Sequence, residues 1–160
     1  MNSELNLKNL DYHEFERKND NEYHFLNDFG VLYQVYFTLG ADYFSDVYFR
    51  NYIKVFGFRP ISSTDFTFDK KTAETIIYIL ADYLSQDDYI VMYVCDEKDK
   101  KQGVRNRLFN RWFKKYNNGS FDKFDLVFEE NTFVSSIISK KNPFYIDFKQ
   151  SFPNLGEEYK

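Results

Sequence analysis

The sequence predicts one α+β domain in which two main helices pack on a mostly antiparallel sheet. The length of 160 residues fits a single domain. Short segments of alternating apolar and polar residues occur on both sides of the chain's middle, joined by Gly- and Asn-containing turns, and they indicate strands. Two segments between them carry apolar residues at spacings of three and four, and they indicate helices. The predicted order is β-β-β-α-β-α-β-β.

Three strands are expected in the first half. Residues 23–26 and 31–38 alternate around a turn at 27–30, which predicts a hairpin. Its second strand places Val31, Tyr33, Val35 and Phe37 on one face. Residues 47–56 are expected to form the third strand, and Pro60 to end it, since proline lacks the backbone donor of a ladder.

The second half alternates between helices and strands. The first helix is predicted over residues 70–84, with Asp69 as its N-cap. Residues 89–95 are almost continuously apolar, which is typical of a central strand covered on both faces. Three further elements follow: a helix over 102–116 that ends at Asn117–Gly119, a hairpin of 124–128 with 132–139, and a segment 144–152 of undecided type.

The domain is expected to span residues 23–152. Residues 1–22 are polar and acidic and predict a loosely ordered lead-in, and 153–160 predict a frayed end. No apolar run approaches the roughly 18 residues of a membrane-spanning helix, and the start has no signal-peptide pattern. We therefore expect a cytoplasmic protein without membrane contact.

Composition argues against several classes of function. A single cysteine excludes a disulfide framework within the chain, and two histidines near the start make a structural zinc site improbable. The net charge of −4 argues against a protein that coats nucleic acid through bulk charge. No phosphate-binding, dinucleotide or metal motif occurs, so no cofactor and no metal are predicted.

One segment stands out by its charge. Residues 98–115 contain eight basic residues and a single acid, Asp99. On a helical wheel four of them, Arg107, Arg111, Lys114 and Lys115, form an outer cationic stripe opposite an apolar arc. Arg105 is the exception, because it falls within the apolar arc, where an isolated charge would be very costly. Asp96, at the end of the central strand, is its nearest candidate partner, and Asp99 is the second.

This segment has two interpretations. In the first, Asp96 or Asp99 caps the second helix and neutralises Arg105. In the second, Lys101, Arg105, Arg107 and the helix N-terminus form a pocket for a phosphate or carboxylate. The candidate cluster, either anion-binding or a structural ion pair, comprises Asp96, Asp99, Lys101, Arg105, Asn106, Arg107 and Arg111.

The same stretch carries a family resemblance. A strand ends in Cys95-Asp96, a charged turn follows, and then come Arg105-Asn-Arg-Leu-Phe109 and Trp112-Phe113 on a helix. This pattern resembles the signature of a small domain family of unknown function found in Bacteroidetes-type bacterial genomes. The resemblance covers residues 23–152 and singles out Asp96, Arg105, Asn106, Arg107 and Trp112, without implying an activity.

No catalytic residue is predicted. The order of elements is similar to that of acetyl-coenzyme-A-dependent N-acetyltransferases, but the turn after the third strand lacks their pyrophosphate-binding pattern. Cys95 ends an apolar strand and is more typical of a core residue than of a nucleophile. Ser135 and Ser136 lie within a strand without the glycine pattern of a nucleophile elbow.

The sequence therefore favours a protein-interaction or regulatory module over an enzyme. An acidic start and a basic helix suit pairing with a protein partner or with a second copy of the chain. The abundance of Asn, Lys, Tyr, Phe and Ile is typical of an AT-rich bacterial genome, and a toxin–antitoxin or phage-defence locus is the setting we expect. The alternatives are a nucleic-acid-binding or nucleic-acid-cleaving protein, in which basic and aromatic residues alternate, and an acyltransferase-like enzyme.

Overall fold

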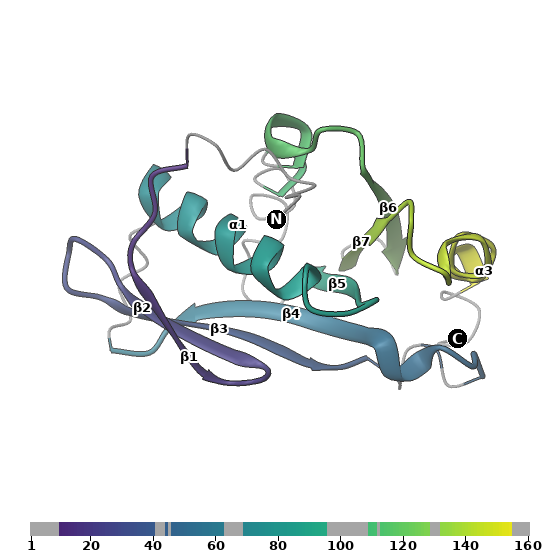
Figure 1. Cartoon of the computed structure of the whole chain (residues 1–160), viewed down its shortest axis with the longest axis horizontal. Helices are drawn as coiled ribbons and strands as arrows, with labels where there is room; N and C mark the ends of the chain where they lie inside the picture. The colour runs from purple at the N-terminus through teal and green to yellow at the C-terminus, as the bar shows by residue number, and fades with distance from the viewer. Residues whose placement is uncertain are drawn as a thin grey trace.

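A seven-stranded sheet with helices on both of its faces forms the core of the fold (Figure 1). The computed structural model describes residues 10–40, 44, 46–62, 69–95, 109–111, 113–128 and 132–154, with the backbone alone for Cys95, Phe128 and Thr132. The strand order is β1-β2-β3-β4-β5-β7-β6. β4 and β5 run parallel, and all other neighbours are antiparallel. The predicted α+β class with a mostly antiparallel sheet is confirmed.

The first hairpin agrees with the prediction. β2 (Glu22–Leu26) pairs with β3 (Leu32–Leu39). In the turn, the side-chain oxygen of Asn27 accepts hydrogen bonds from the backbone N–H groups of Phe29 and Val31, each at a distance of 2.9 Å. Gly30 has a φ of 77°, which a glycine adopts without strain. The predicted inner face of β3 is buried, as alternation requires.

The next strand begins later than predicted. Residues 50–52 form the 3₁₀-helix η2 (Arg50–Tyr52), and β4 (Ile53–Pro60) continues through Gly57 to Pro60. The expected strand over 47–56 is therefore wrong in its bounds. Phe49 is buried and stacks on Phe144, at 5.3 Å between ring centroids, so this part of the chain packs against a core instead of extending. Pro60 has no backbone N–H to donate to a neighbouring strand. The strand tolerates it because β5 pairs with β4 only over Ile53–Val55, at the other end of β4.

Two elements occur where the sequence predicts none or leaves the type open. β1 (Phe15–Asn19) lies within the segment expected to be a loose lead-in, and it pairs with β2 at the edge of the sheet. Near the other end, α3 (Tyr145–Ser151) and the 3₁₀-helix η4 (Phe152–Asn154) form the segment of undecided type. Phe148 and Phe152 anchor them, and both are buried.

The remaining elements follow the prediction closely. α1 (Lys70–Leu84) has the predicted bounds, and the Asp69 side chain accepts a hydrogen bond from the Thr72 N–H. β5 (Ile90–Cys95) is an interior strand between β4 and β7. β6 (Phe121–Phe128) starts three residues before its predicted position and forms the second hairpin with β7 (Thr132–Ser139). Residues 109–111 and 113–116 are helical, within the predicted second helix.

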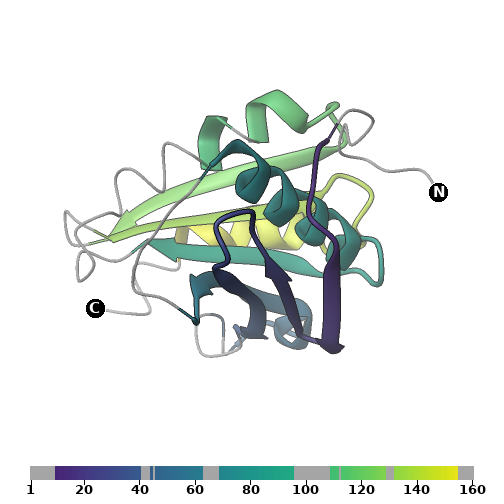
Figure 2. The same ribbon diagram turned by 90° about the vertical axis from the view of Figure 1, so that its left-hand side faces the viewer.

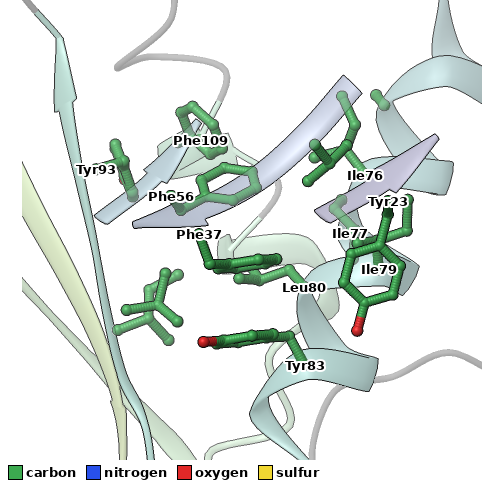
Figure 3. Packing of buried hydrophobic residues seen from close by; sticks show 14 of the residues in the cluster. Tyr23, Phe37, Phe56, Ile76, Ile77, Ile79, Leu80, Tyr83, Tyr93 and Phe109 are labelled. Atoms are coloured by element: carbon green, nitrogen blue, oxygen red, sulfur yellow. The ribbon is translucent and has the colours of Figure 1, made fainter. Parts of the chain in front are cut away.

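Each face of the sheet has its own core. Under α1 and helix 109–116, the ring of Phe37 stacks on Tyr83 at 3.7 Å between centroids, and Phe109 stacks on Tyr93 at 4.1 Å (Figure 3). On the opposite face, Met92 and Ile138 belong to a second core that α3 covers. Figure 2 shows helix 109–116 in green beside α1, with α3 in yellow across the strands. β5 contributes to both cores, as its continuous apolar sequence predicts.

Candidate functional site

Most of the cluster predicted from the sequence lies outside the described residues. This holds for Asp96, Asp99, Lys101, Arg105, Asn106 and Arg107, and also for Trp112. Arg111 is described, and it is exposed on helix 109–116. The ion pair between Arg105 and Asp96 and the anion pocket therefore both stay predictions.

Helix 109–116 has two chemically different sides. Phe109 and Tyr116 are buried and Phe113 is half-buried, whereas Arg111, Lys114 and Lys115 are exposed. This division agrees with the apolar arc and the cationic stripe of the helical wheel. The helix ends where predicted, at Tyr116, and the Asn117 N–H makes a helical hydrogen bond with the Phe113 carbonyl at 2.9 Å. Gly119 follows with a φ of 96°.

An apolar pocket lies between this helix, α1 and the sheet. The volume within it that the centre of a water-sized sphere can occupy is about 30 Å³, and it opens to solvent. Its seven lining residues are all apolar or aromatic and come from three elements: Ile76, Ile77 and Leu80 of α1, Phe109, Phe113 and Tyr116 of helix 109–116, and Ile137 of β7. A hollow of this size is smaller than the pockets that hold small ligands, and it suits the tip of a single apolar side chain.

A buried hydrogen bond fixes one end of this pocket. The Tyr116 hydroxyl donates a hydrogen bond to Glu74 Oε1 at 2.8 Å, and the backbone N–H of Asp11 donates one to Glu74 Oε2 at 3.0 Å. Glu74 is 4% exposed, so its carboxylate depends on these donors for the hydrogen bonds that water would otherwise supply. Burial and the hydrogen bond to Glu74 raise the pKa of Tyr116 to about 12. Tyr116 therefore stays a neutral donor at physiological pH.

Two lysines lie at the same end of the pocket. Lys70 Nζ is 3.9 Å from Glu74 Oε1, and its side chain is 78% exposed. Lys115 Nζ is 5.2 Å from the centroid of the Tyr116 ring, a cation–π distance. Glu74 is buried, whereas the exposed Asp11 carboxylate lies 3.9 Å from Lys71 Nζ, so the lysines around Tyr116 share the solvent-facing surface with one acid of this group.

Glu74 is not among the site residues that the sequence predicts. Its position gave a signal, because Glu74 lies three residues before Ile77 and is the one charged residue on the buried side of α1. An acid at such a position must find hydrogen-bond donors when the helix packs. Its donors come from Tyr116 and Asp11, which are 42 and 63 residues away in the chain, so sequence spacing could not identify them.

A second polar cluster lies on β6 and β7. Lys123 Nζ and the Ser135 hydroxyl both donate to Asp125 Oδ1, and Lys123 Nζ is also 3.4 Å from Ser135 Oγ. The Lys123 side chain is only 7% exposed, while Asp125 is 55% exposed. Because the serine hydrogen is directed to a carboxylate that already pairs with the lysine, this arrangement neutralises a buried charge and does not activate a nucleophile.

The histidines lie far from these serines in the fold. His13 is buried, and its backbone N–H donates to Thr75 Oγ1 at the start of α1. His24 lies on the open face of β2, where its Nε2 is 2.6 Å from Glu22 Oε2. Within the described ranges, no group of three His, Cys, Asp or Glu side chains could hold a metal ion. A search of the same ranges finds no helix with the length and apolarity needed to cross a membrane.

Comparison with known proteins gives one family match. The model of a family of unknown function, DUF6169, matches residues 68–153. This segment runs from just before α1 into η4 and contains every lining residue of the pocket, together with Glu74 and Lys115. The strands β1 to β4 precede it. Comparison with curated proteins gives no match.

Proposed function

Because the chain belongs to DUF6169, a family of unknown function, we propose that it is a protein-interaction module whose contact site is the pocket between α1 and helix 109–116. The observation that carries this proposal is the composition of the pocket wall, which is apolar on all three contributing elements. A site that positions a substrate for chemistry needs several convergent polar groups, and here Tyr116 alone lines the pocket with one.

The proposed occupant is an apolar side chain from an acidic segment of a partner protein. The pocket accepts the apolar group, and Lys70 and Lys115 meet the acids that flank it. Arg111 and Lys114 continue the positive surface along the helix, where they increase the rate at which an acidic partner associates. A buried aromatic or aliphatic anchor surrounded by weaker polar contacts is the usual energetic plan of such an interface.

A peptide-binding experiment tests this function. The probe is a fluorescent 12-residue peptide (a length of about three helical turns) rich in Glu, with one central Phe. We expect it to bind the wild-type protein. Replacing the Phe by Ser, or the Glu residues by Lys, is expected to weaken binding by about tenfold or more, since each change removes at least ~1.4 kcal/mol.

Two variants locate the binding. Phe113→Ala removes a wall of the pocket, and Lys115→Glu reverses a charge beside it. Both are expected to weaken peptide binding, while Lys149→Glu, at an exposed position of α3, serves as the charge control and is expected to bind as wild type. Equal binding of all three peptides, or full binding by both pocket variants, would contradict the proposal.

The wider setting is also a proposal. We place the module in the cytoplasm of a Bacteroidetes-type bacterium and in a toxin–antitoxin or phage-defence locus, on the resemblance of residues 93–113 and on the composition of the chain. Nucleic acid is the alternative partner for the basic side of helix 109–116. A salt-dependent gel shift of RNA or DNA that is lost in Arg111→Glu would favour that alternative. A rise in melting temperature with coenzyme A would favour the acyltransferase alternative.

A further inference from the structure

The two edges of the sheet differ in how they are protected. β1 has five residues, and its register with β2 shifts between Arg17 and Asn19. Its middle residues, Glu16, Arg17 and Lys18, are charged and exposed. Short length, irregular register and charge are the features by which proteins prevent an edge strand from pairing with another chain. β1 is thus a protected edge.

β6 also carries charges, at Asp122, Lys123 and Asp125, but it is neither short nor irregular. It has eight residues and pairs with β7 in one unbroken register, from Phe121 opposite Ser139 to Phe128 opposite Thr132. Among the described strands β7 is its sole neighbour, so its other edge presents backbone donors and acceptors. Val127 on this strand is 54% exposed. A long, regular edge of this kind is a template for a further strand.

We propose that β6 pairs antiparallel with β6 of a second copy of this chain, so that one sheet runs through both copies. The two copies are then related by a two-fold axis, and the residue through which the axis passes determines which residues of the two β6 strands lie opposite each other. When the axis passes through Phe124, Lys123 lies opposite the partner's Asp125. This surface is separate from the pocket, so the inference does not depend on the proposed function.

Charge selects this register over its neighbours. An axis through Lys123 places two lysines opposite each other, and an axis through Asp125 does the same with two aspartates. An axis between two consecutive residues of β6 would set side chains of opposite faces against each other, which an antiparallel pair does not allow. Like charges directly opposite destabilise a strand pair, and unlike charges stabilise it. In the selected register each Lys123 gains a second carboxylate, and Asp125, which is 55% exposed, becomes covered.

Light scattering after size exclusion and hydrogen exchange test the inference. We expect the chain to form a dimer as concentration rises, with slower exchange of β6 amides and unchanged exchange of β1 amides. Val127→Lys places a charge on the edge and is expected to weaken association by about tenfold or more. Leu39→Lys is the matched control, since Leu39 is 56% exposed at the end of β3, which is an interior strand.

A charge swap tests the register itself. Asp125→Lys places a lysine opposite Lys123 of the other copy and is expected to prevent dimer formation. The double variant Lys123→Asp/Asp125→Lys again places opposite charges against each other and is expected to restore the dimer. A chain that stays monomeric at every concentration overturns the inference. It is equally overturned by a dimer that Val127→Lys leaves intact and in which β6 amides exchange as in the monomer. If Asp125→Lys fails to fold, Val127→Lys decides the matter.

Discussion

The hydroxyl of Tyr116 donates a hydrogen bond to Glu74 Oε1 over 2.8 Å and thereby joins helix 109–116 to α1. The backbone N–H of Asp11 donates to the other oxygen of the same carboxylate, so Glu74 connects three parts of the chain that are distant in sequence. These contacts set the separation of the two helices, and that separation forms the pocket between them.

Tyr116→Phe is expected to destabilise the fold. The change removes a donor from a buried carboxylate, and the loss of a hydrogen bond to a charged group costs about 1.5–3 kcal/mol. Denaturant unfolding measures the free energy. Tyr48→Phe is the control, because Tyr48 donates to Asp147 over 2.6 Å but is exposed, and its free energy of unfolding should stay close to that of wild type. Equal stability of Tyr116→Phe and wild type would show that the bond does not hold the helix.

Stability is expected to fall at alkaline pH. Burial and the bond to Glu74 raise the pKa of Tyr116 to about 12, and burial is the main cause that raises the pKa of Tyr23 to about 12. Unfolded tyrosine ionises near pH 10. The folded state therefore retains protons that the unfolded state loses, so stability is complete below about pH 10 and decreases as pH rises towards about 12.

Denaturation at a series of pH values measures this loss, and absorbance of tyrosinate shows which rings ionise late. In Tyr116→Phe the decrease should be smaller than in wild type. A free energy of unfolding that is constant from pH 9 to pH 12, where ordinary tyrosines titrate at about 10, would contradict the assigned pKa values.

Gly57→Ala is expected to displace the ring of Tyr36. Gly57 lies opposite Tyr36 in the register of β3 and β4, and a Cβ at Gly57 would approach the Tyr36 ring to 2.4 Å. The ring must move, which also disturbs its cation–π contact with Arg59, at 5.8 Å. We expect a cost of about 1 kcal/mol, the usual scale of one cross-strand contact.

A double-mutant cycle checks this relation. Tyr36→Ala removes the ring, so Gly57→Ala should cost less in that background than in wild type. Additive free energies of unfolding would show that the two positions do not interact.

The sequence predicts the elements whose signals are local. α1 has its predicted bounds because Asp69 caps it and its apolar residues follow one periodicity. The hairpin of β2 and β3 follows from alternation and from Asn27 and Gly30 in its turn. The helical wheel predicts which positions of helix 109–116 are exposed, because amphipathic periodicity depends only on residues close in sequence.

Other features depend on contacts that the sequence does not contain. Residues 47–52 alternate like a strand, but the burial of Phe49 against Phe144 decides their conformation. β1 is charged and gives no apolar pattern, because one edge of it faces solvent. The hydrogen-bond donors to Glu74 come from Asp11 and Tyr116, which are distant in sequence. The pocket forms only where α1, helix 109–116 and β7 meet in the fold. The cluster around Arg105 lies outside the described residues and stays a prediction.

Methyl NMR of isoleucine during titration with the Glu-rich peptide that carries a central Phe tests the central claim most directly. Ile76, Ile77 and Ile137 line the pocket, whereas Ile79 is buried on α1 without lining it and Ile146 is exposed on α3. We expect the first three methyl signals to shift as the peptide binds, while those of Ile79 and Ile146 stay in place. Peptide binding that leaves the three pocket signals unmoved, or no binding at all, would contradict that claim.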